Sequence, residues 1–151
     1  MKKYKEVILG LALTFITVSA FSQSDEAQVE AAMKAYKSGI ESLSTEGLSD
    51  LFMEDSQVFE SGGSEGSFNH YLDHHLGPEL KVFSAFDFND YNISTIVDLP
   101  YAFTTETYVY KIVIASSGKV IEKKGVATSV LKKIEGKWLI MKTHSSSRAK
   151  K

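Results

Sequence analysis

The stretch that decides the fold is Lys119–His144, KVIEKKGVATSVLKKIEGKWLIMKTH. Two runs rich in Val, Ile, Thr and Leu, residues 119–134 and 137–144, flank the pair Glu135-Gly136. Such runs favour β-strands, and a short glycine-containing connection between them is typical of a β-hairpin. The pattern predicts two long antiparallel strands at the end of the chain.

Strands also fill the region that precedes this hairpin. The predicted strands span residues 81–89, 92–97 and 102–115, which are rich in β-branched and aromatic residues. Ser116-Ser-Gly118 forms the connection to the next strand. From Lys81 onward the sequence therefore predicts consecutive antiparallel strands.

The first half of the chain has helical periodicity instead. Apolar residues recur at helical spacing from Asp25 to about Leu43, after a capping serine and early acids. The other predicted elements are a short helix near residues 48–52, a strand at 56–60, a flexible connection at 61–67, and a helix at 68–76. Gly77 and Pro78 are expected to end that last helix. Helices followed by antiparallel strands predict one α+β domain over residues 24–151, with about three helices on one face of a curved sheet.

The first twenty residues have the layout of a secretory signal peptide. Three lysines precede an apolar run from Val7 to Phe21, and small residues stand at Val18 and Ala20. We expect residues 1–23 to be removed, by cleavage after Ala20 or after Gln23. A retained membrane anchor is the weaker alternative, because a spanning helix needs about 20 apolar residues. The prediction is an exported protein, periplasmic or secreted, with no membrane contact after processing.

Composition narrows the classes of partner. The chain has 17 Lys and Arg against 19 Asp and Glu, a net charge of −2. Loss of the N-terminal lysines would make it more acidic, which argues against a nucleic-acid partner because phosphate binding needs a positive surface. There is no cysteine, so no disulfide or lipid-acceptor thiol is available and the core alone must stabilise the fold.

The order of elements and the closing run Gly136-Lys-Trp-Leu-Ile-Met-Lys-Thr-His-Ser-Ser resemble the nuclear-transport-factor-two-like superfamily, including its SnoaL-like and ketosteroid-isomerase-like members. The resemblance covers residues 25–148. It implies a cone with the cystatin-like fold: a bent antiparallel or mixed sheet around helices, with a pocket at the open end and often a homodimer. It implies no single activity, because members include isomerases, cyclases, dehydratases, hydrolases and binding modules.

All four histidines lie in two segments, residues 68–80 and 138–148. On a helical wheel, His75 falls beside the apolar side of the predicted helix 68–76. His70 and His74 fall on its polar side. Strict alternation along the last strand puts His144 on the same face as Trp138 and Ile140. His144 is therefore expected to point into the open end of the cone.

Three interpretations of His75, Glu79 and His144 remain open. The three residues could bind one divalent metal through two imidazoles and a carboxylate. Alternatively, His144 could act as a general acid or base near neutral pH, oriented by Glu79 and His75. In the third interpretation, both histidines are partly buried and only shape the pocket. The cofactor is accordingly either absent or one divalent metal ion.

Aromatic residues suggest the lining of the pocket. We expect ligand contacts from Tyr71, Tyr108, Tyr110 and Trp138, because such rings bury a large apolar area and carry a polar group. The expected partner is a small molecule that is at least partly apolar. Whether the domain is an enzyme, a non-catalytic ligand-binding or accessory module, or a structural dimer module stays open at this point.

Overall fold

The computed structural model describes residues 23–150, so the predicted Ala20 cleavage site and nearly all of the predicted signal peptide lie outside the described residues. The helical elements are α1 (Asp25–Glu41), the 3-10 helix η1 (Leu48–Leu51), α2 (Phe68–Tyr71), the π-helical turn η2 (Leu72–Leu76) and α3 (Gly77–Leu80). The strands are β1 (Phe52–Glu60), β2 (Gly63–Gly66), β3 (Phe83–Asp98), β4 (Tyr101–Ile114), β5 (Val120–Ile134) and β6 (Lys137–Ala149).

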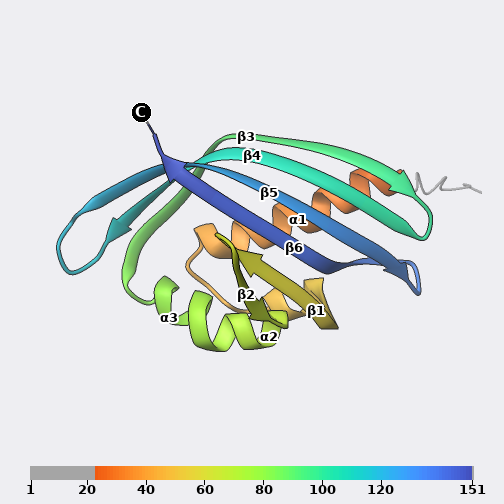
Figure 1. Cartoon of the computed structure of the whole chain (residues 1–151), viewed down its shortest axis with the longest axis horizontal. Helices are drawn as coiled ribbons and strands as arrows, with labels where there is room; N and C mark the ends of the chain where they lie inside the picture. The colour runs from red at the N-terminus through yellow and green to blue at the C-terminus, as the bar shows by residue number, and fades with distance from the viewer. Residues whose placement is uncertain (1–22, 151) are drawn as a thin grey trace, which may run out of the picture.

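The six strands form one curved sheet in the order β2-β1-β6-β5-β4-β3. Strands β3 to β6 pair antiparallel in succession, whereas β1 pairs parallel with β6. Figure 1 shows α1 lying along one face of the long strands, with the α2–α3 segment below it near β1 and β2. The predicted α+β class with a curved mixed sheet is confirmed.

Helix α1 forms where the sequence predicts it, and it presents one face to the sheet. Ser24 caps its N-terminus by accepting a hydrogen bond from the backbone N–H of Ala27, and Asp25 and Glu26 occupy the first turn. The residues of α1 that are buried are Val29, Met33, Tyr36, Lys37 and Ile40. Their helical spacing makes a continuous stripe, and Lys37 is the only charged member of it.

Stacked aromatic rings join three of the elements. The rings of Phe52 on β1 and Phe68 on α2 are parallel, with centroids 3.6 Å apart. Tyr36 of α1 meets both rings edge-on, at centroid distances of 5.2 and 5.7 Å. Such pairs add about 0.5–1.5 kcal/mol each beyond the burial of their area. This stack positions α1 and α2 relative to the sheet.

Register shifts interrupt the pairing of the long strands, and two of them change the predicted elements or faces. The pairing of β3 with β4 shifts between Asn89 and Asn92, where Asp90 has a φ of +50°. The predicted strands 81–89 and 92–97 are therefore parts of one strand, β3, because a bulge interrupts the ladder without ending it. A second shift lies between Val130 and Leu131, which pair with Lys142 and Ile140, so Met141 is the extra residue on β6.

The predictions for residues 61–80 were wrong in two respects. The supposed flexible connection contains β2, which folds back onto β1 as a hairpin. The helical segment does not end at Gly77 and Pro78 but continues to Leu80. The π-helical turn explains this continuation, because the N–H of Gly77 bonds to Leu72 O across the wider turn. Pro78 then occupies the first turn of α3, where its missing N–H costs nothing.

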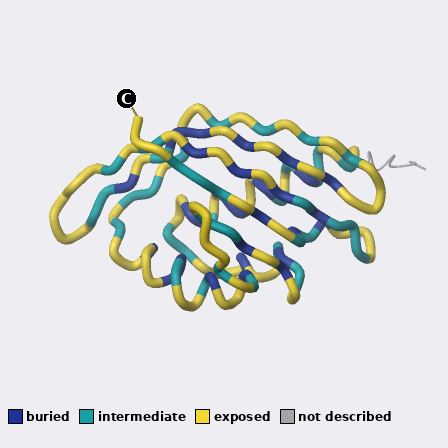
Figure 2. Tube along the Cα trace, viewed as in Figure 1, coloured by how far each residue is buried: buried dark blue, intermediate teal, exposed yellow. Residues whose placement is uncertain are grey.

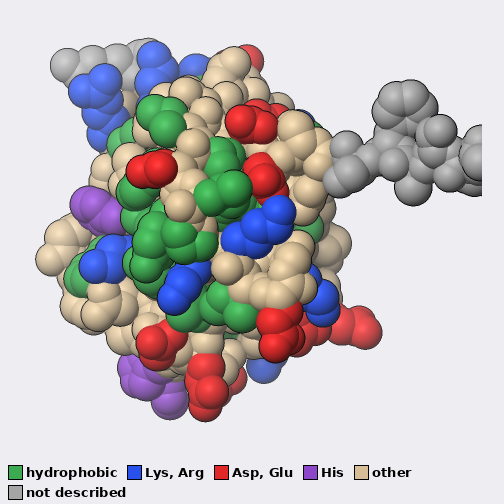
Figure 3. Space-filling view, turned by 90° about the vertical axis from the view of Figure 1, so that its right-hand side faces the viewer, with side chains coloured by type: hydrophobic (Ala, Val, Ile, Leu, Met, Phe, Trp, Pro, Cys, Tyr) green, Lys and Arg blue, Asp and Glu red, His purple; other side chains and the backbone are tan. Residues whose placement is uncertain are grey.

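Buried and exposed positions alternate along the long strands (Figure 2). The inner face packs on α1, and the outer face is open. Figure 3 shows hydrophobic side chains gathered on one end of the molecule, where the β3–β4 connection lies. The exposed large hydrophobic residues of this region are Ile96, Leu99, Tyr101 and Phe103. Within residues 23–150, no helix has the length and apolar character needed to span a bilayer.

Candidate functional site

A cavity of about 110 Å³ lies between α1, the α2–α3 segment and the inner face of the sheet. Its aromatic lining consists of Tyr36, Tyr71, Phe86, Phe88, Tyr108 and Tyr110. Its charged lining consists of Lys37, Glu60 and Glu79. Small and hydroxyl residues of β5 and β6 form the remaining wall, among them Ala127, Thr143, Ser145 and Ser147. The cavity thus combines apolar rings with a few ionisable groups, as small-molecule sites do.

Lys37, which lines the cavity, belongs to a buried ion pair. Lys37 Nζ of α1 lies 3.6 Å from Glu106 Oε1 of β4, and the two side chains are 10% and 0% exposed. The hydroxyl of Tyr91 donates a 2.6 Å hydrogen bond to the same Glu106 oxygen. The other carboxylate oxygen, Oε2, has no hydrogen-bond partner among the residues of the described chain. Burying two charged groups costs desolvation free energy. Buried ionisable groups of this kind cluster at functional sites, so the pair is a candidate functional feature.

Three aromatic rings surround the ammonium group of Lys37. Nζ lies 4.8 Å from the ring centroid of Tyr108, 5.0 Å from that of Phe88 and 5.3 Å from that of Tyr36. Burial lowers the pKa of Lys37, although the neighbouring Glu106 carboxylate opposes this effect. The ring faces stabilise the cation by cation–π attraction but provide no hydrogen-bond acceptor. Lys37 is therefore held in a weakly solvating environment.

A second group of charged residues, Glu60, Glu65 and Glu79, gathers around Tyr71 and His75. The Tyr71 hydroxyl donates a hydrogen bond of 2.9 Å to Glu60 Oε2. His75 lies between two other acids, with Nδ1 3.2 Å from Glu65 Oε2 and Nε2 3.3 Å from Glu79 Oε1. The rings of Tyr71 and His75 are 5.1 Å apart. One carboxylate is thus bound by the Tyr71 hydroxyl, and two others contact the His75 imidazole.

These contacts shift the proton affinities of His75 and Glu79. Burial alone would lower the pKa of His75, but the hydrogen bond to Glu65 and the charges of Glu79 and Glu60 raise it overall. Burial also raises the pKa of Glu79, and the nearby Glu60 and Glu65 add to this, while His75 opposes it. A carboxyl group with a raised pKa retains a proton closer to neutral pH and can donate it. Glu79 is the lining residue with this property.

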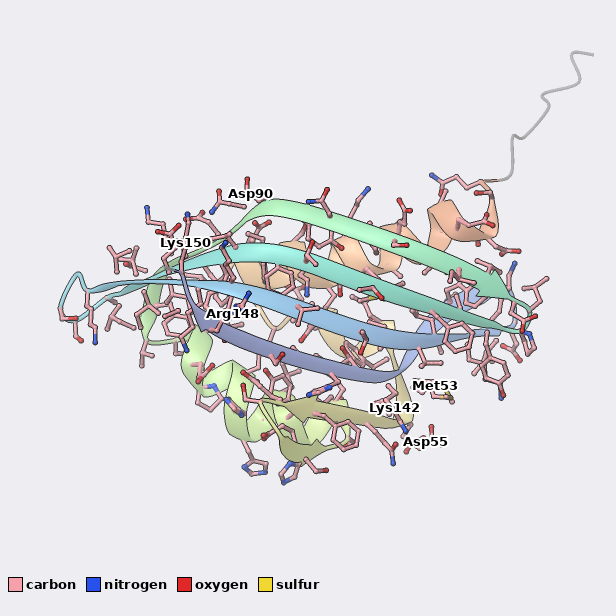
Figure 4. All side chains as sticks on the ribbon, turned by 45° about the horizontal axis from the view of Figure 1, so that its top comes forward. Met53, Asp55, Asp90, Lys142, Arg148 and Lys150 are labelled. Carbon is pink, nitrogen blue, oxygen red and sulfur yellow. The ribbon has the colours of Figure 1, made fainter. Side chains whose placement is uncertain are left out.

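His144 does not face the cavity, so the sequence-based prediction of its orientation was wrong. The bulge at Met141 adds one residue to β6, which reverses the alternation after Ile140. Thr143 is consequently buried, and His144 is exposed on the outer face beside Phe59 of β1, at a ring distance of 6.4 Å. Figure 4 shows Lys142, two residues earlier on the same face, at the β1 edge near Asp55.

The predicted metal trio is not brought together. His75 and Glu79 are in contact, but His144 lies on the other face of the sheet. No group of three or more His, Cys, Asp or Glu side chains within residues 23–150 has an arrangement that could hold a metal ion. His70 and His74 are exposed neighbours, with ring centroids 4.5 Å apart.

Three of the four predicted ligand-contact residues line the cavity, and the fourth does not. Tyr71, Tyr108 and Tyr110 line the cavity. Trp138 does not, because it lies in the core and its indole N–H donates a 3.1 Å hydrogen bond to Asp25 Oδ1 at the start of α1. Lys133 Nζ also binds Asp25, and these two bonds lower the pKa of that carboxyl. Trp138 therefore fastens α1 to the β5–β6 hairpin.

Tyr108 lines both the cavity and a second, more open hollow formed by β4, β5 and the end of β6. The hollow is lined by Tyr108, Gly125, Arg148 and Asp90, among others. Figure 4 shows Arg148 and Lys150 at the end of β6, on the same side of the molecule as Asp90. Gly125 makes this arrangement possible, because a Cβ there would lie 2.2 Å from Tyr108 Cε2. A glycine opposite the ring therefore fixes the position of the cavity wall.

Sequence reasoning missed Lys37, Glu106 and Glu60. A signal for the first two was present. Lys37 lies four residues after Met33, within the apolar stripe of α1, and Glu106 alternates with Tyr108 on the inner face of β4. Charged residues at core positions are unusual, and their pairing could have been proposed from the two patterns. No pattern in the sequence placed Glu60 near Tyr71.

The chain matches no family model and no curated protein. It does resemble solved structures. One is an NTF2-like superfamily protein from Salmonella enterica serovar Typhimurium, 19% identical, with a TM-score of 0.73 over 83% of this chain and 92% of that one. Another is a candidate ketosteroid isomerase from Shewanella frigidimarina, 20% identical, with a TM-score of 0.66 over 81% of this chain and 96% of that one.

A third neighbour is an NTF2-like protein with a cystatin-like fold from Novosphingobium aromaticivorans. It is 14% identical, with a TM-score of 0.64 over 81% of this chain and 80% of that one. Identities this low establish the fold and leave the activity open. The curved six-stranded sheet around α1, together with these neighbours, identifies the chain as having the NTF2-like, cystatin-like fold.

Proposed function

We propose that the chain binds a small, partly apolar molecule in the cavity between α1 and the sheet. The observation that carries this proposal is the presence of Lys37, Glu60 and Glu79 in a cavity otherwise lined largely by aromatic rings. Burying ionisable groups costs free energy that an all-apolar core would avoid. A ligand with a polar group and an apolar body would contact both kinds of lining.

The size of the cavity limits the ligand. A cavity of about 150 Å³ holds one benzene molecule, and this cavity measures about 110 Å³. The ligand, or the part of it that enters, is therefore about the size of one aromatic ring. Glu60 and Glu79 favour a hydrogen-bond donor on its outer part, while Tyr108, Phe88 and Lys37 surround its inner part.

Binding of two single-ring probes, phenol and benzyl alcohol, is tested by two-dimensional amide NMR. We expect at least one probe to shift resonances of α1 and of the inner-facing residues of β4 to β6. Ala127→Leu should abolish these shifts, because Ala127 is a buried lining residue and the larger side chain fills the space. Val126→Leu on the exposed face of the same strand is the matched control. Shifts unaffected by Ala127→Leu would contradict binding in this cavity.

A second candidate function is acid–base catalysis with Glu79 in the role that the sequence suggested for His144. Two observations favour it. Glu79 lines the cavity and has a raised pKa, and the His75 imidazole contacts its carboxylate. One of the similar structures is a candidate ketosteroid isomerase, and another a candidate scytalone dehydratase. Both names describe reactions in which protons move.

Proton transfer is tested with cyclohexanone in D₂O, by following deuterium incorporation at its α carbon by NMR. Catalysed exchange that is lost in Glu79→Gln but retained in His144→Gln would support the enzyme. Binding of cyclohexanone without any exchange would favour the non-catalytic ligand-binding domain. The Glu79→Gln change keeps the side-chain size, so a folded variant is expected.

Export and self-association are further parts of the proposal. The lysines and apolar run of residues 1–20 support export, and N-terminal sequencing of protein from the periplasm should find Phe21 or Ser24 as the first residue.

The exposed Ile96 and Phe103 on the outer face of the sheet support a homodimer. Light scattering should then give twice the chain mass, and Phe103→Lys should return it to one chain.

A further inference from the structure

We propose that Lys37 is a nucleophile that forms an imine with an aldehyde or ketone bound in the cavity. This inference rests on the proposed function, because the carbonyl compound is the ligand of the same cavity. It names the class of ligand and the bond that joins it to the chain. It goes beyond binding, since a covalent bond forms and water is released.

The position of Lys37 distinguishes it from the other lysines. It is the one buried lysine within residues 23–150, yet it lines the cavity. Lys34, one turn earlier on α1, has a side chain that is 60% exposed. An amine at the wall of a ligand-sized cavity can meet a bound carbonyl group at close range. The surface lysines can meet one only by collision from solvent.

The surroundings of Lys37 suit an amine that must be unprotonated to attack. The charged group next to Nζ is the Glu106 carboxylate on β4, at 3.6 Å. The neutral rings of Tyr36 on α1 and Tyr108 on β4 also lie close to Nζ. The Glu106 carboxylate opposes the effect of burial, because its charge and its hydrogen bonding to Nζ both raise the pKa of Lys37. Desolvation lowers its pKa, as in lysines that form imines in apolar pockets.

The step balances with the groups present. The lone pair of Nζ attacks the carbonyl carbon, and the carbonyl π electrons move to oxygen, which takes up a proton. Nitrogen gives up one proton as the carbinolamine forms. The carbinolamine then loses its hydroxyl group as water after a second protonation of the oxygen, and nitrogen gives up its other proton to leave a C=N bond. Glu79 is a lining carboxyl that can donate the proton, and Glu106 lies beside Nζ to accept one. One carbonyl and one amine thus give one imine and one water.

The test traps the imine by reduction. The full protein is incubated with benzaldehyde and sodium cyanoborohydride, and the modified residue is located by peptide mass mapping. We expect Lys37 to carry a benzyl group at least tenfold more often than Lys34, although Lys34 is the more exposed. Equal labelling of both residues, or labelling of surface lysines alone, would overturn the inference.

Variants and a second probe complete the experiment. Lys37→Arg keeps a positive charge beside Glu106 and should lose the cavity adduct, while Lys34→Arg is the matched control and should keep it. Benzyl alcohol has nearly the same shape as benzaldehyde and no carbonyl group. If benzyl alcohol shifts the cavity resonances but Lys37 is not trapped, the imine inference fails and the binding proposal stands. If neither probe binds and nothing is trapped, both are overturned.

Discussion

Lys37 Nζ of α1 lies 3.6 Å from Glu106 Oε1 of β4, and the Glu106 side chain is completely buried. The pair joins α1 to β4, and its Lys37 member lines the cavity. Removing one partner of a buried ion pair leaves an uncompensated charge, which costs about 3–5 kcal/mol. The energetic consequence of this relationship can be measured directly.

We expect Glu106→Gln and Lys37→Met each to lower the free energy of unfolding by about 3–5 kcal/mol. The double variant should lose much less than the two changes together, because neither charge is then left alone in the interior. Urea unfolding of the four proteins gives the coupling energy. Additive losses would mean that the two groups do not interact in the folded protein.

The orientation of His144 leads to a second prediction. Its side chain is exposed on the outer face of the sheet, so His144→Ala should change the free energy of unfolding by less than about 0.5 kcal/mol. It should also leave the binding of phenol and benzyl alcohol unchanged. Tyr71→Phe is the contrasting variant, because it removes the 2.9 Å hydrogen bond to Glu60 at the cavity. NMR titration of both variants with the two probes measures this difference, and we expect weaker binding in Tyr71→Phe only. Weaker binding in His144→Ala alone would contradict the described geometry.

Gly125 provides a third prediction. A Cβ at this position would lie 2.2 Å from the ring of Tyr108, so Gly125→Ala must displace the ring or the strand. We expect a loss of about 1–3 kcal/mol in the free energy of unfolding, as for other overpacked sites. In a Tyr108→Leu background the same change should cost less, since the shorter side chain leaves room. Equal costs in both backgrounds would indicate that strand geometry, and not the ring, determines the penalty.

A fourth prediction concerns pH. The pKa of His75 is raised above its ordinary value of 6.5 in the folded protein, so protonation favours folding. The stabilisation is complete below about pH 6.5 and is lost as pH rises through the folded pKa. Glu79, whose pKa is also raised, acts in the same direction at lower pH, above its ordinary value of 4.5.

Urea unfolding across this pH range, compared between the natural protein and His75→Gln, isolates the contribution of the histidine. We expect the natural protein to lose more stability with rising pH, by less than about 1 kcal/mol because the side chains of His75 and Glu79 are partly exposed. Glu65→Gln should reduce the difference, since the hydrogen bond to Glu65 is the main contact that raises the pKa of His75. Parallel pH profiles for all three proteins would contradict the assigned contacts.

Local pattern in the sequence determined the elements and the class of fold. The periodicity of Asp25–Glu41, with its serine cap, predicted α1 almost to the residue. The hairpin around Glu135-Gly136 and the strand from Ala102 were equally clear, because alternation and turn residues are local properties. These elements were enough to indicate a curved sheet packed on helices. Tyr71, Tyr108 and Tyr110 line the cavity, and their role as ligand contacts stays a prediction.

Only the tertiary structure decided which polar side chains meet there. One extra residue at the Met141 bulge turns His144 outward and Thr143 inward, and a single residue of register reverses every side chain that follows. The contacts of Lys37 with Glu106 and of Tyr71 with Glu60 join residues far apart in the chain or on different elements. The burial pattern of α1 and β4 could mark Lys37 and Glu106 as core residues, but which residues meet depends on how the strands and helices pack. The sequence thus specified the parts of the fold, whereas packing and register specified the site.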